Sequence, residues 1–334
     1  MIDELPRFRA AQLPTPLEEA KRLSDALGGP RILLKRDDLT GAGLGGNKVR
    51  KLEYIVGAAI AEGADTLVVC GGYQSNLARI ASALGARAGL KVELILGGVP
   101  GEPRPIKGNL LLDGLLGARV HFVETIPRWE FGTAIEDVAE DVRRRGGKPF
   151  VMPLGGSSPA GMAGYVRAVT ELNGQLSAMD VRADYLVAAI GSGGTYSGLI
   201  LGAVNQNVSW KTLGVSVSRT AEYLVDKMVE ELPSAAAQLG LQHVPSRSDL
   251  LITDEYIGEG YGVATQGGVE AIKLLGRTEG ILLDQVYSGK AFHALADWIA
   301  KGRIGKTQTV VFLLSGGVPA LFAESPEIFA ISNG

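Results

Sequence analysis

Residues 66–76 of the chain read Thr66-Leu67-Val68-Val69-Cys70-Gly71-Gly72-Tyr73-Gln74-Ser75-Asn76. An apolar run without polar alternation is typical of a strand that is buried on both faces of a parallel sheet. Two glycines end the run, and the Ala-rich stretch from Ser75 to about Ala88 predicts a helix directly after them. A buried strand, a tight turn and a helix form one repeating unit of an α/β fold.

The same alternation of apolar runs and helical patterns continues on both sides of this unit. Helical patterns cover residues 47–62, 109–116 and 133–145, and further helices are expected after the later runs. This alternation indicates the doubly wound class of α/β fold, whose ligands bind outside the carboxyl ends of the strands. We therefore expect functional residues in the turns that follow the strands. The other expected strands are residues 31–35, 92–96, 119–123, 149–154, 185–190, 212–217, 250–253 and 309–314.

Length and composition restrict the class of protein. With 334 residues, the chain can form one large or two medium domains. Hydrophobic residues make up 46% and charged residues 21%, which excludes a disordered chain. The 46 glycines are about twice the usual share of roughly 7%, as expected for many short turns or for backbone that approaches a ligand. The net charge is −3 and no basic block occurs, so we expect no nucleic-acid partner.

Cysteine and histidine are too few and too scattered for a disulfide framework or a metal site. Cys70 is the single cysteine, which excludes an internal disulfide and a site of clustered cysteines. His121, His243 and His293 are far apart, and each is expected to be an ordinary core or surface residue. The first residues lack the pattern of a signal peptide, and no run of about 18 apolar residues occurs. We therefore expect a cytoplasmic protein without metal or membrane contact.

A glycine-rich turn before the helical pattern at residues 47–62 carries two lysines. The stretch Gly41-Ala42-Gly43-Leu44-Gly45-Gly46-Asn47-Lys48 places Lys48 at a helix start, with Lys51 one turn further on the same face. The glycine spacing, and the lack of Ser or Thr after the lysine, differ from a Walker phosphate loop. Backbone amides and the helix dipole would lower the pKa of Lys48, as a Schiff-base lysine requires, and Lys51 could meet a phosphate. The alternative is a solvated basic helix start.

Two further turns after expected strands offer groups that bind anions. Gly71-Gly72 followed by Ser75-Asn76 makes a cradle of free amides for a carboxylate or a phosphate, unless Ser75 is only a helix cap. The loop Gly191-Ser192-Gly193-Gly194-Thr195 lies between a strand and a helix, which favours a phosphate site over a simple tight turn. Its glycine spacing is not that of the dinucleotide fingerprint, so a phosphate without a nucleotide is expected.

Four further segments contain candidate site residues, although each is a weaker signal than the turns above. Ser157-Ser158-Pro159 predicts another helix start, and Ser315 follows the last strand. Tyr261 and Tyr287 each lie in a loop that contains glycine. Together with the two lysines and the anion-binding turns, these residues indicate a site for a phosphate-bearing aldehyde cofactor.

The order of the motifs resembles a known family over nearly the whole chain. The motifs are Pro14-Thr15-Pro16-Leu17, Lys35-Arg36-Asp37-Asp38, Gly45-Gly46-Asn47-Lys48, Gln74-Ser75-Asn76, Gly191-Ser192-Gly193-Gly194-Thr195 and Val286-Tyr287-Ser288-Gly289-Lys290. In this order and spacing they resemble the fold-type II pyridoxal-phosphate enzymes, and within them the family of D-cysteine desulfhydrase and 1-aminocyclopropane-1-carboxylate deaminase.

The resemblance implies a fold, a cofactor and an assembly. The fold would be that of tryptophan synthase β, an α/β fold with two open, doubly wound, mostly parallel sheets. A small domain, residues 52–158, would be inserted into a large cofactor-binding domain made of residues 1–51 and 159–334. The cofactor would be pyridoxal 5'-phosphate, and the protein would be a homodimer.

The resemblance also implies a role for each residue singled out above. Lys48 would carry the cofactor as a Schiff base, Asn76 would meet its phenolic oxygen, and the amides of residues 75–77 would hold the substrate carboxylate. The phosphate would be bound by Lys51, Gly191, Ser192, Gly193, Gly194 and Thr195. The catalytic residues would be Lys48, Ser75, Tyr261 and Tyr287.

Two departures from the family pattern concern the substrate. Leu77 stands where the deaminases commonly have Gln and the desulfhydrases His, which removes a polar side chain near the substrate. Ser288 stands where the deaminases have a Glu that protonates the pyridine nitrogen, so a hydroxyl of Ser288 or Ser315 would face that nitrogen instead. A neutral pyridine is a poorer electron sink, which disfavours a long-lived carbanion and suits the elimination of a good leaving group.

We therefore expect a lyase that catalyses α,β-elimination from a small β-substituted amino acid and yields pyruvate and ammonia. The expected substrate is D-cysteine or a related sulfur amino acid, including L-cysteate, whose sulfonate could meet Ser157 in the Ser157-Ser158 turn. The alternatives are a 1-aminocyclopropane-1-carboxylate deaminase and a transferase that replaces the β-substituent. The complete set of catalytic residues disfavours a protein that only binds the amino acid or the cofactor.

Overall fold

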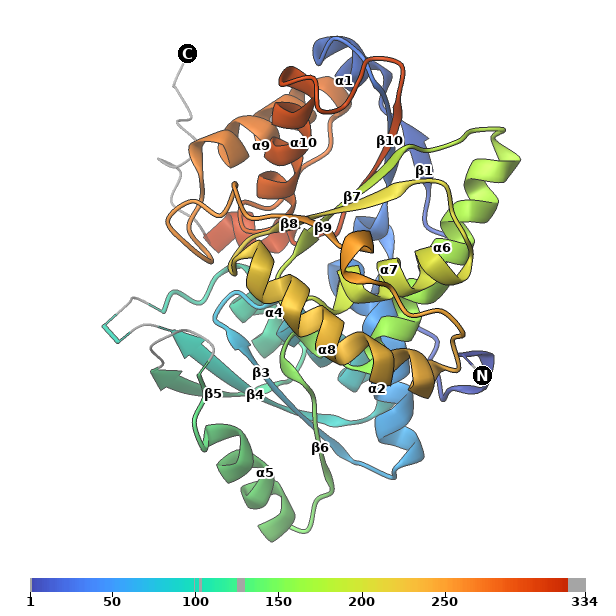
Figure 1. Ribbon diagram of the computed structural model, residues 1–334. Helices are drawn as coiled ribbons and strands as arrows, with labels where there is room; N and C mark the ends of the chain where they lie inside the picture. The colour runs from blue at the N-terminus through green and yellow to red at the C-terminus, as the bar shows by residue number, and fades with distance from the viewer. Residues whose placement is uncertain (1, 99, 102–103, 125–129, 324–334) are drawn as a thin grey trace.

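The strands of the protein form two separate sheets (Figure 1), in a computed structural model that describes residues 2–98, 100–101, 104–124 and 130–323. The larger sheet has the strand order β1-β2-β10-β7-β8-β9, and the smaller one β5-β4-β3-β6. All neighbouring pairs are parallel except β1 and β2. This confirms the predicted α/β fold with two mostly parallel sheets. The strands are β1 (Leu17–Glu19), β2 (Arg31–Lys35), β3 (Thr66–Gly72), β4 (Lys91–Gly98), β5 (Arg119–Glu124), β6 (Pro149–Val151), β7 (Tyr185–Ile190), β8 (Lys211–Ser216), β9 (Leu251–Thr253) and β10 (Thr309–Leu313).

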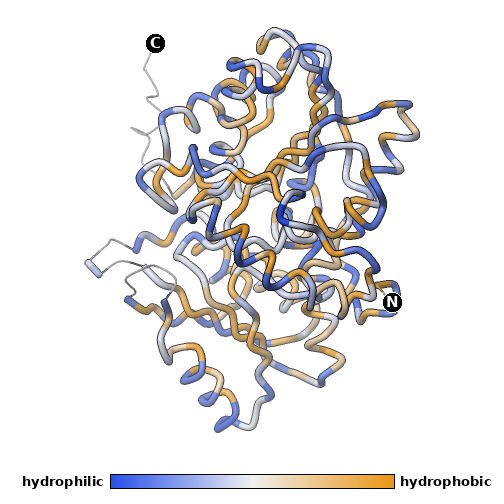
Figure 2. Tube along the Cα trace, in the orientation of Figure 1, coloured by the Kyte–Doolittle hydropathy of each residue, from blue (hydrophilic) through white to orange (hydrophobic). Residues whose placement is uncertain are grey.

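Helices cover both faces of each sheet. On β3, Leu67 and Val69 pack in one apolar cluster with α2 and α3, whereas Val68 and Cys70 pack in another with α5. Figure 2 shows hydrophobic residues along the strands of both sheets and an alternation of hydrophilic and hydrophobic residues on α5. Burial on both faces explains why the strand residues lack polar alternation. The helices are α1 (Lys21–Ala26), α2 (Asn47–Ala61), α3 (Asn76–Ala88), α4 (Gly108–Leu115), α5 (Ala134–Arg144), α6 (Pro159–Ala178), α7 (Gly194–Asn205), α8 (Ala221–Leu239), α9 (Gln266–Glu279) and α10 (Ser288–Ala300).

The observed elements differ from the predicted ones mainly at their ends. Strand β1 is not indicated by the sequence, because a three-residue edge strand is too short to show a period. Helix α3 begins at Asn76 because Ser75 caps it, with its Oγ accepting a hydrogen bond from the amide of Ala78 at 3.2 Å. No helix in the described part of the chain is long and apolar enough to cross a membrane.

The strands of the smaller sheet all come from one segment of the chain. They lie between residues 66 and 151, and the strands of the larger sheet lie outside that segment. In Figure 1 the smaller sheet and α5 occupy the lower part of the view, and the larger sheet lies above them. Domain boundaries at residues 51/52 and 158/159 stay a prediction, and we propose them on the distribution of the strands. Helix α2 runs across the first of these boundaries.

A buried ion network fixes the position of α2. Arg50 donates from Nε and Nη2 to the carboxylate of Asp37, both at 2.8 Å, and from Nη2 to Glu171 of α6 at 2.7 Å. Lys35 at the end of β2 donates to the same Glu171 oxygen at 2.5 Å. Burial alone would raise the pKa of Glu171, yet the hydrogen bonds and charges of Arg50 and Lys35 lower that pKa to about 2. The network therefore joins the larger sheet and α6 to the start of α2.

Arg50→Met should lower the free energy of unfolding by about 3–5 kcal/mol, because it leaves buried carboxylates without their partner. Arg31→Met is the matched control, since the Arg31–Glu19 pair lies at the surface and should contribute less than about 1 kcal/mol. Chemical denaturation of both variants measures the difference. Equal losses in the two variants would contradict a structural role for the network.

Candidate active site

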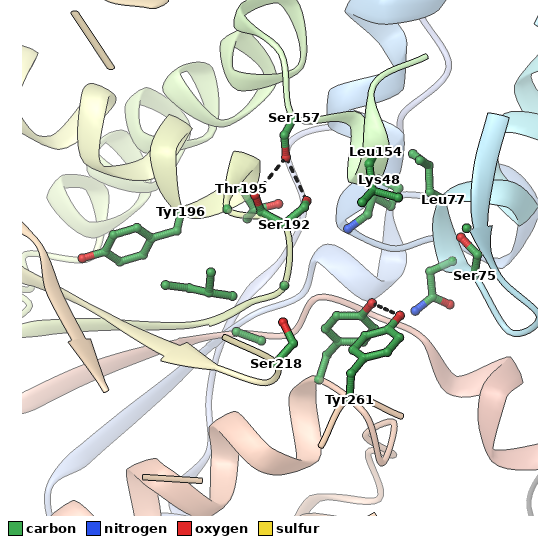
Figure 3. A pocket seen from close by; sticks show the side chains of 18 of the residues that line it. Lys48, Ser75, Leu77, Leu154, Ser157, Ser192, Thr195, Tyr196, Ser218 and Tyr261 are labelled. Carbon is green, nitrogen blue, oxygen red and sulfur yellow. Dashed lines mark hydrogen bonds between the residues drawn. The ribbon is translucent and has the colours of Figure 1, made fainter. Parts of the chain in front are cut away.

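A cavity of about 350 Å³, here called the first cavity, lies where the carboxyl ends of strands from both sheets meet. Its wall is formed by the ends of β3 and β7, the starts of α2, α3 and α7, and the loops after β6, β8 and β10. In Figure 3 the amine of Lys48 points into this space, with Ser75 on one side and Ser157, Ser192 and Thr195 on another. Open α/β sheets bind their ligands at this edge.

The charges in the wall favour an anionic ligand. Among the described residues that line the first cavity, four are Lys or Arg and none is Asp or Glu. A buried cation without a nearby carboxylate is costly, so binding of an anion would stabilise the site. No cluster of His, Cys, Asp and Glu in the described part of the chain could hold a metal ion. The desolvated cations are Lys48 and Lys51. The other two are Arg219, which is exposed, and Lys227, which forms an ion pair with Glu231.

Lys48 is the second residue of α2 and presents a weakly basic amine. The helix begins after Gly46, whose φ of 118° is accessible to glycine and rare for other residues. Desolvation is the main cause that lowers the pKa of Lys48 to about 8; the charge of Asp284 opposes the shift and that of Arg79 adds to it. About one tenth of Lys48 is therefore uncharged at pH 7, far more than for an ordinary lysine, and the uncharged amine is the form that acts as a nucleophile or accepts a proton.

Lys51 lies against the 191–195 loop. Its Nζ donates to the carbonyl of Gly155 at 2.7 Å, and a Cβ on Gly194 would lie 2.7 Å from that Nζ. The amine of Lys51 can therefore lie this close to the loop only because residue 194 is a glycine. Desolvation, and then the charge of Lys48, lower the pKa of Lys51 well below its ordinary value. A bound phosphate would reverse that shift, because it places opposite charge beside the amine.

Hydroxyls and a helix N-terminus complete the phosphate site. Ser157 donates to Ser192 Oγ at 2.8 Å and accepts from the amide of Gly194, the first residue of α7, at 3.1 Å. Thr195 Oγ1 accepts from Asn47 Nδ2 at 3.1 Å, which ties the start of α7 to the start of α2. Free amides and the dipole of α7 add to these donors. The residues present therefore fit the phosphate of the expected cofactor.

Asn76 offers a hydrogen-bond donor on the side of the cavity opposite this phosphate site. Its Oδ1 accepts from Asn109 at 2.9 Å and from Arg79 at 3.4 Å, so its Nδ2 is the group left for a ligand. A Cβ on Gly317 would lie 3.0 Å from that Nδ2. A donor at this position fits the predicted contact with a phenolic oxygen.

Two tyrosines form a hydrogen-bonded pair at the edge of the cavity (Figure 3). The hydroxyls of Tyr261 and Tyr287 are 2.6 Å apart, and their rings pack edge to face. Desolvation, followed by the effects of Tyr261 and Asp284, raises the pKa of Tyr287 well above its ordinary value. Tyr287 therefore stays protonated and can act as an acid.

Asp284 orients the loop that carries Tyr287. Its carboxylate accepts from the amides of Val286, Tyr287 and Ser288 at 2.8–2.9 Å. Ser288 Oγ donates to Asp284 Oδ1 at 2.5 Å and accepts from the Asp284 amide at 2.9 Å. Of the two hydroxyls expected near a pyridine nitrogen, Ser288 is thus committed to Asp284, whereas Ser315 lines the cavity.

The structure brings nearly all the predicted site residues together. The two exceptions are Ser288 and Gly194, which do not line the cavity; Gly194 lies behind it, against Lys51 and Ser157. Ser157, predicted to meet the substrate, lies with the phosphate-binding groups. The predicted residues that line the cavity are Lys48, Lys51, Ser75, Asn76, Leu77, Ser157, Gly191, Ser192, Gly193, Thr195, Tyr261, Tyr287 and Ser315.

Several wall residues were not singled out by the sequence. Cys70 was noted only as the single cysteine, although its position at the end of β3 could have placed it here. Phe131 lies in a loop without a local signal, and Leu154, the last residue of the expected strand 149–154, begins a short 3-10 turn in the loop after β6. Both are apolar residues of the cavity wall, as is Leu77. Asp284 could have been found, because Asp commonly caps the turn before a helix.

Comparisons with known proteins give matches over almost the whole chain. The family described as "Pyridoxal-phosphate dependent enzyme" matches residues 9–316. A protein of Pyrococcus abyssi (strain GE5 / Orsay), named "Putative 1-aminocyclopropane-1-carboxylate deaminase", is 37% identical over 331 residues, which are 99% of this chain and 97% of that protein. A protein of the same name from Pyrococcus horikoshii is also 37% identical, over 99% of this chain and 98% of its own. The crystal structure of an "ACC deaminase homologue" superposes with a TM-score of 0.90 at 36% identity, covering 99% of this chain and 98% of that one.

In cofactor-free protein, acetylation of Lys48 should rise with pH through a midpoint near 8, because the neutral amine is the reactive form. Pulse labelling with acetic anhydride, read by peptide mass spectrometry, measures this, and the exposed Lys21 serves as an internal reference. A rate for Lys48 that still rises steeply above pH 10 would contradict the desolvated environment. Added inorganic phosphate should slow the labelling of Lys51 more than that of Lys21.

Proposed function

Because the chain belongs to the family of pyridoxal-phosphate-dependent enzymes, we propose that it is a lyase for small β-substituted amino acids. The reaction removes the α-proton and a β-leaving group and releases pyruvate and ammonia. When bound, pyridoxal phosphate withdraws electrons from the α-carbon of the amino acid attached to it. The protein supplies the binding groups, the proton acceptor and the proton donor.

The first cavity contains a group that would bind each part of the cofactor. Lys48 would bind its aldehyde covalently, and Asn76 Nδ2 would donate to its phenolic oxygen. Lys51, Ser192 and the start of α7 would bind its phosphate. Ser315, at the end of the larger sheet, is the hydroxyl that we assign to the ring nitrogen.

One observation supports elimination rather than ring opening. None of the described residues that line the first cavity has a carboxyl group. A carboxylate beside the ring nitrogen would keep that nitrogen protonated and strengthen electron withdrawal. Ser315 cannot do this, and Asp284 is committed to the amides of its own loop. Loss of a β-substituent discharges the α-carbanion without such a strong electron sink, so elimination is the reaction that this wall supports best.

The chain supplies an acid and a base on the two sides of the reacting carbons. The neutral amine of Lys48 accepts the α-proton, and its pKa of about 8 makes it a competent base near neutral pH. Tyr287 donates a proton to the leaving group and takes one back from Tyr261 through their 2.6 Å hydrogen bond. Ser75 holds the substrate carboxylate together with the first amides of α3.

For the substrate, we propose D-cysteine or a related sulfur amino acid with a neutral leaving group. Ser157, a candidate for binding a second anion such as the sulfonate of L-cysteate, is hydrogen-bonded to Ser192 and Gly194. We therefore assign Ser157 to the cofactor phosphate. Leu77, which lines the cavity beside Ser75, offers no polar group to a charged side chain.

Deamination of 1-aminocyclopropane-1-carboxylate is the second candidate activity. It is favoured by the names of the two Pyrococcus relatives and of the structure at a TM-score of 0.90. The apolar Leu77 would also accept the two methylene groups of the cyclopropane ring. The two candidates differ in their keto-acid product.

A panel of D- and L-cysteine, β-chloro-D- and L-alanine and 1-aminocyclopropane-1-carboxylate distinguishes the two activities. We expect pyruvate from at least one cysteine or chloroalanine enantiomer, with a higher kcat/KM than for 2-oxobutyrate formation from the ring compound. The keto acids are separated by chromatography. A higher kcat/KM for 2-oxobutyrate formation would instead assign the deaminase activity.

Tyr287→Phe and Tyr261→Phe should lower kcat for cysteine by about 10²–10⁴-fold, because each interrupts proton delivery to sulfur. The loss should be smaller for β-chloroalanine, since chloride leaves without a proton. Tyr256→Phe is the matched control, because it also loses a 2.6 Å hydrogen bond, to Asp297, but lies outside the cavity wall. Equal losses for both substrates would argue against proton donation by the tyrosine pair.

A further inference from the structure

A second cavity of about 380 Å³ adjoins the first. The two share Gly72, Asn76, Tyr261 and Tyr287 among their lining residues. The hydrogen-bonded tyrosines therefore form part of the wall between the two cavities. None of the roles given above uses the second cavity.

The charged groups that line the second cavity are already paired. Arg104 forms an ion pair with Glu124 at 3.2 Å, and the Asp284 carboxylate is bonded to the amides of its loop. The amide of Gln74 accepts from Asn109 at 2.8 Å and donates to the carbonyl of Lys107 at 3.1 Å. A ligand in this space thus meets few groups that require a charged partner.

Most of the remaining lining is small, apolar or aromatic, and the exceptions are the amide side chains of Asn76 and Gln285. Tyr73 packs edge-on against Phe122 at 5.7 Å between ring centroids, and the Arg104 guanidinium lies 5.5 Å from the centroid of Tyr73. Flat aromatic and guanidinium groups of this kind suit a planar, uncharged organic group. The small or apolar residues of the lining include Gly97, Gly98, Pro105, Val286, Ala320 and Ala323.

The tyrosine pair connects this space to the reaction. On the proposed function, on which this inference rests, Tyr287 gives its proton to the sulfur that leaves the β-carbon. The sulfur must then lie beside the shared wall, and a substituent on that sulfur extends away from the β-carbon. The second cavity is the adjoining space that can receive it.

We infer that the second cavity is a leaving-group site and that the substrates include cysteine thioethers with an alkyl or aryl group on sulfur. In the reaction, Lys48 takes the α-proton, the Cβ–S bond breaks with its electrons on sulfur, and the tyrosine pair protonates the sulfur. The products are a free thiol and an enamine, and water hydrolyses the enamine to pyruvate and ammonia. No oxidant or reductant is required.

The test compares S-phenylcysteine with β-chloroalanine, both enantiomers of each, in the cofactor-loaded protein. We expect the wild type to release pyruvate from both and to process S-phenylcysteine with a higher kcat/KM than cysteine. Ala320→Leu narrows the second cavity and should lower the ratio of kcat/KM for S-phenylcysteine to that for β-chloroalanine by about tenfold or more. Ala323 lies half-buried in the wall of the same cavity. Ala323→Leu should also lower this ratio, and it replaces Ala320→Leu in the test if that variant does not fold. The exposed Ala237→Leu on α8 is the control and should leave the ratio unchanged.

Two results would overturn the inference. One is a wild type that releases pyruvate from β-chloroalanine but not from S-phenylcysteine. The other is an unchanged ratio in every folded variant that narrows the cavity. A protein that releases pyruvate from none of these amino acids would instead refute the proposed function.

Discussion

The separation of two kinds of buried charge on helix α2 is the constraint on which the site depends. Arg50 points to the network of Asp37 and Glu171, where its charge is fully paired. Lys48 and Lys51, on the cavity side, face a wall in which no described residue is a carboxylate. Two charged amines in such a space would cost several kcal/mol each unless an anion joined them, and burial therefore lowers the pKa of both. The paired network holds the helix in place, so the amines cannot move out to water.

The same edge gathers several helix N-termini around these amines. Helices α2, α3 and α7 begin there because each follows a strand, or a loop beside one, whose carboxyl end lies at that edge. Their free amides add positive potential without further side chains. An amino acid bears a carboxylate and the cofactor bears a phosphate, so both find complementary groups at one end of the fold. The charge pattern thus explains the preference for anionic ligands, and the reacting bond is selected by other residues.

The sequence predicted the fold, and most of the predicted site residues line one cavity, because both depend on local patterns at strand ends. The segments after β2, β3 and β7 contribute predicted residues to the cavity, Lys48, Ser75 and Ser192 among them. Of the two hydroxyls predicted near the ring nitrogen, Ser315 was preferred to Ser288, and the local sequence did not show where the hydroxyl of Ser288 points. Ser288 neighbours Tyr287 in sequence, yet at a helix start its hydroxyl turns back to Asp284, and only the folded loop shows this. Phe131 and Leu154 were not found as site residues for the same reason, since only the folded loops place them in the wall.

Desolvation explains how a base and an acid coexist in this cavity. Removal from water disfavours the charged form of every group, so the same burial lowers the pKa of Lys48 and raises that of Tyr287. Burial thereby favours the neutral form of each group, in which an amine can accept a proton and a phenol can donate one. Opposite shifts in one site are the usual means by which proteins assign these two roles at neutral pH. The tyrosine pair stands at the boundary of the two cavities, so under the proposed function its proton would reach the leaving group there, and Lys48 would accept the α-proton.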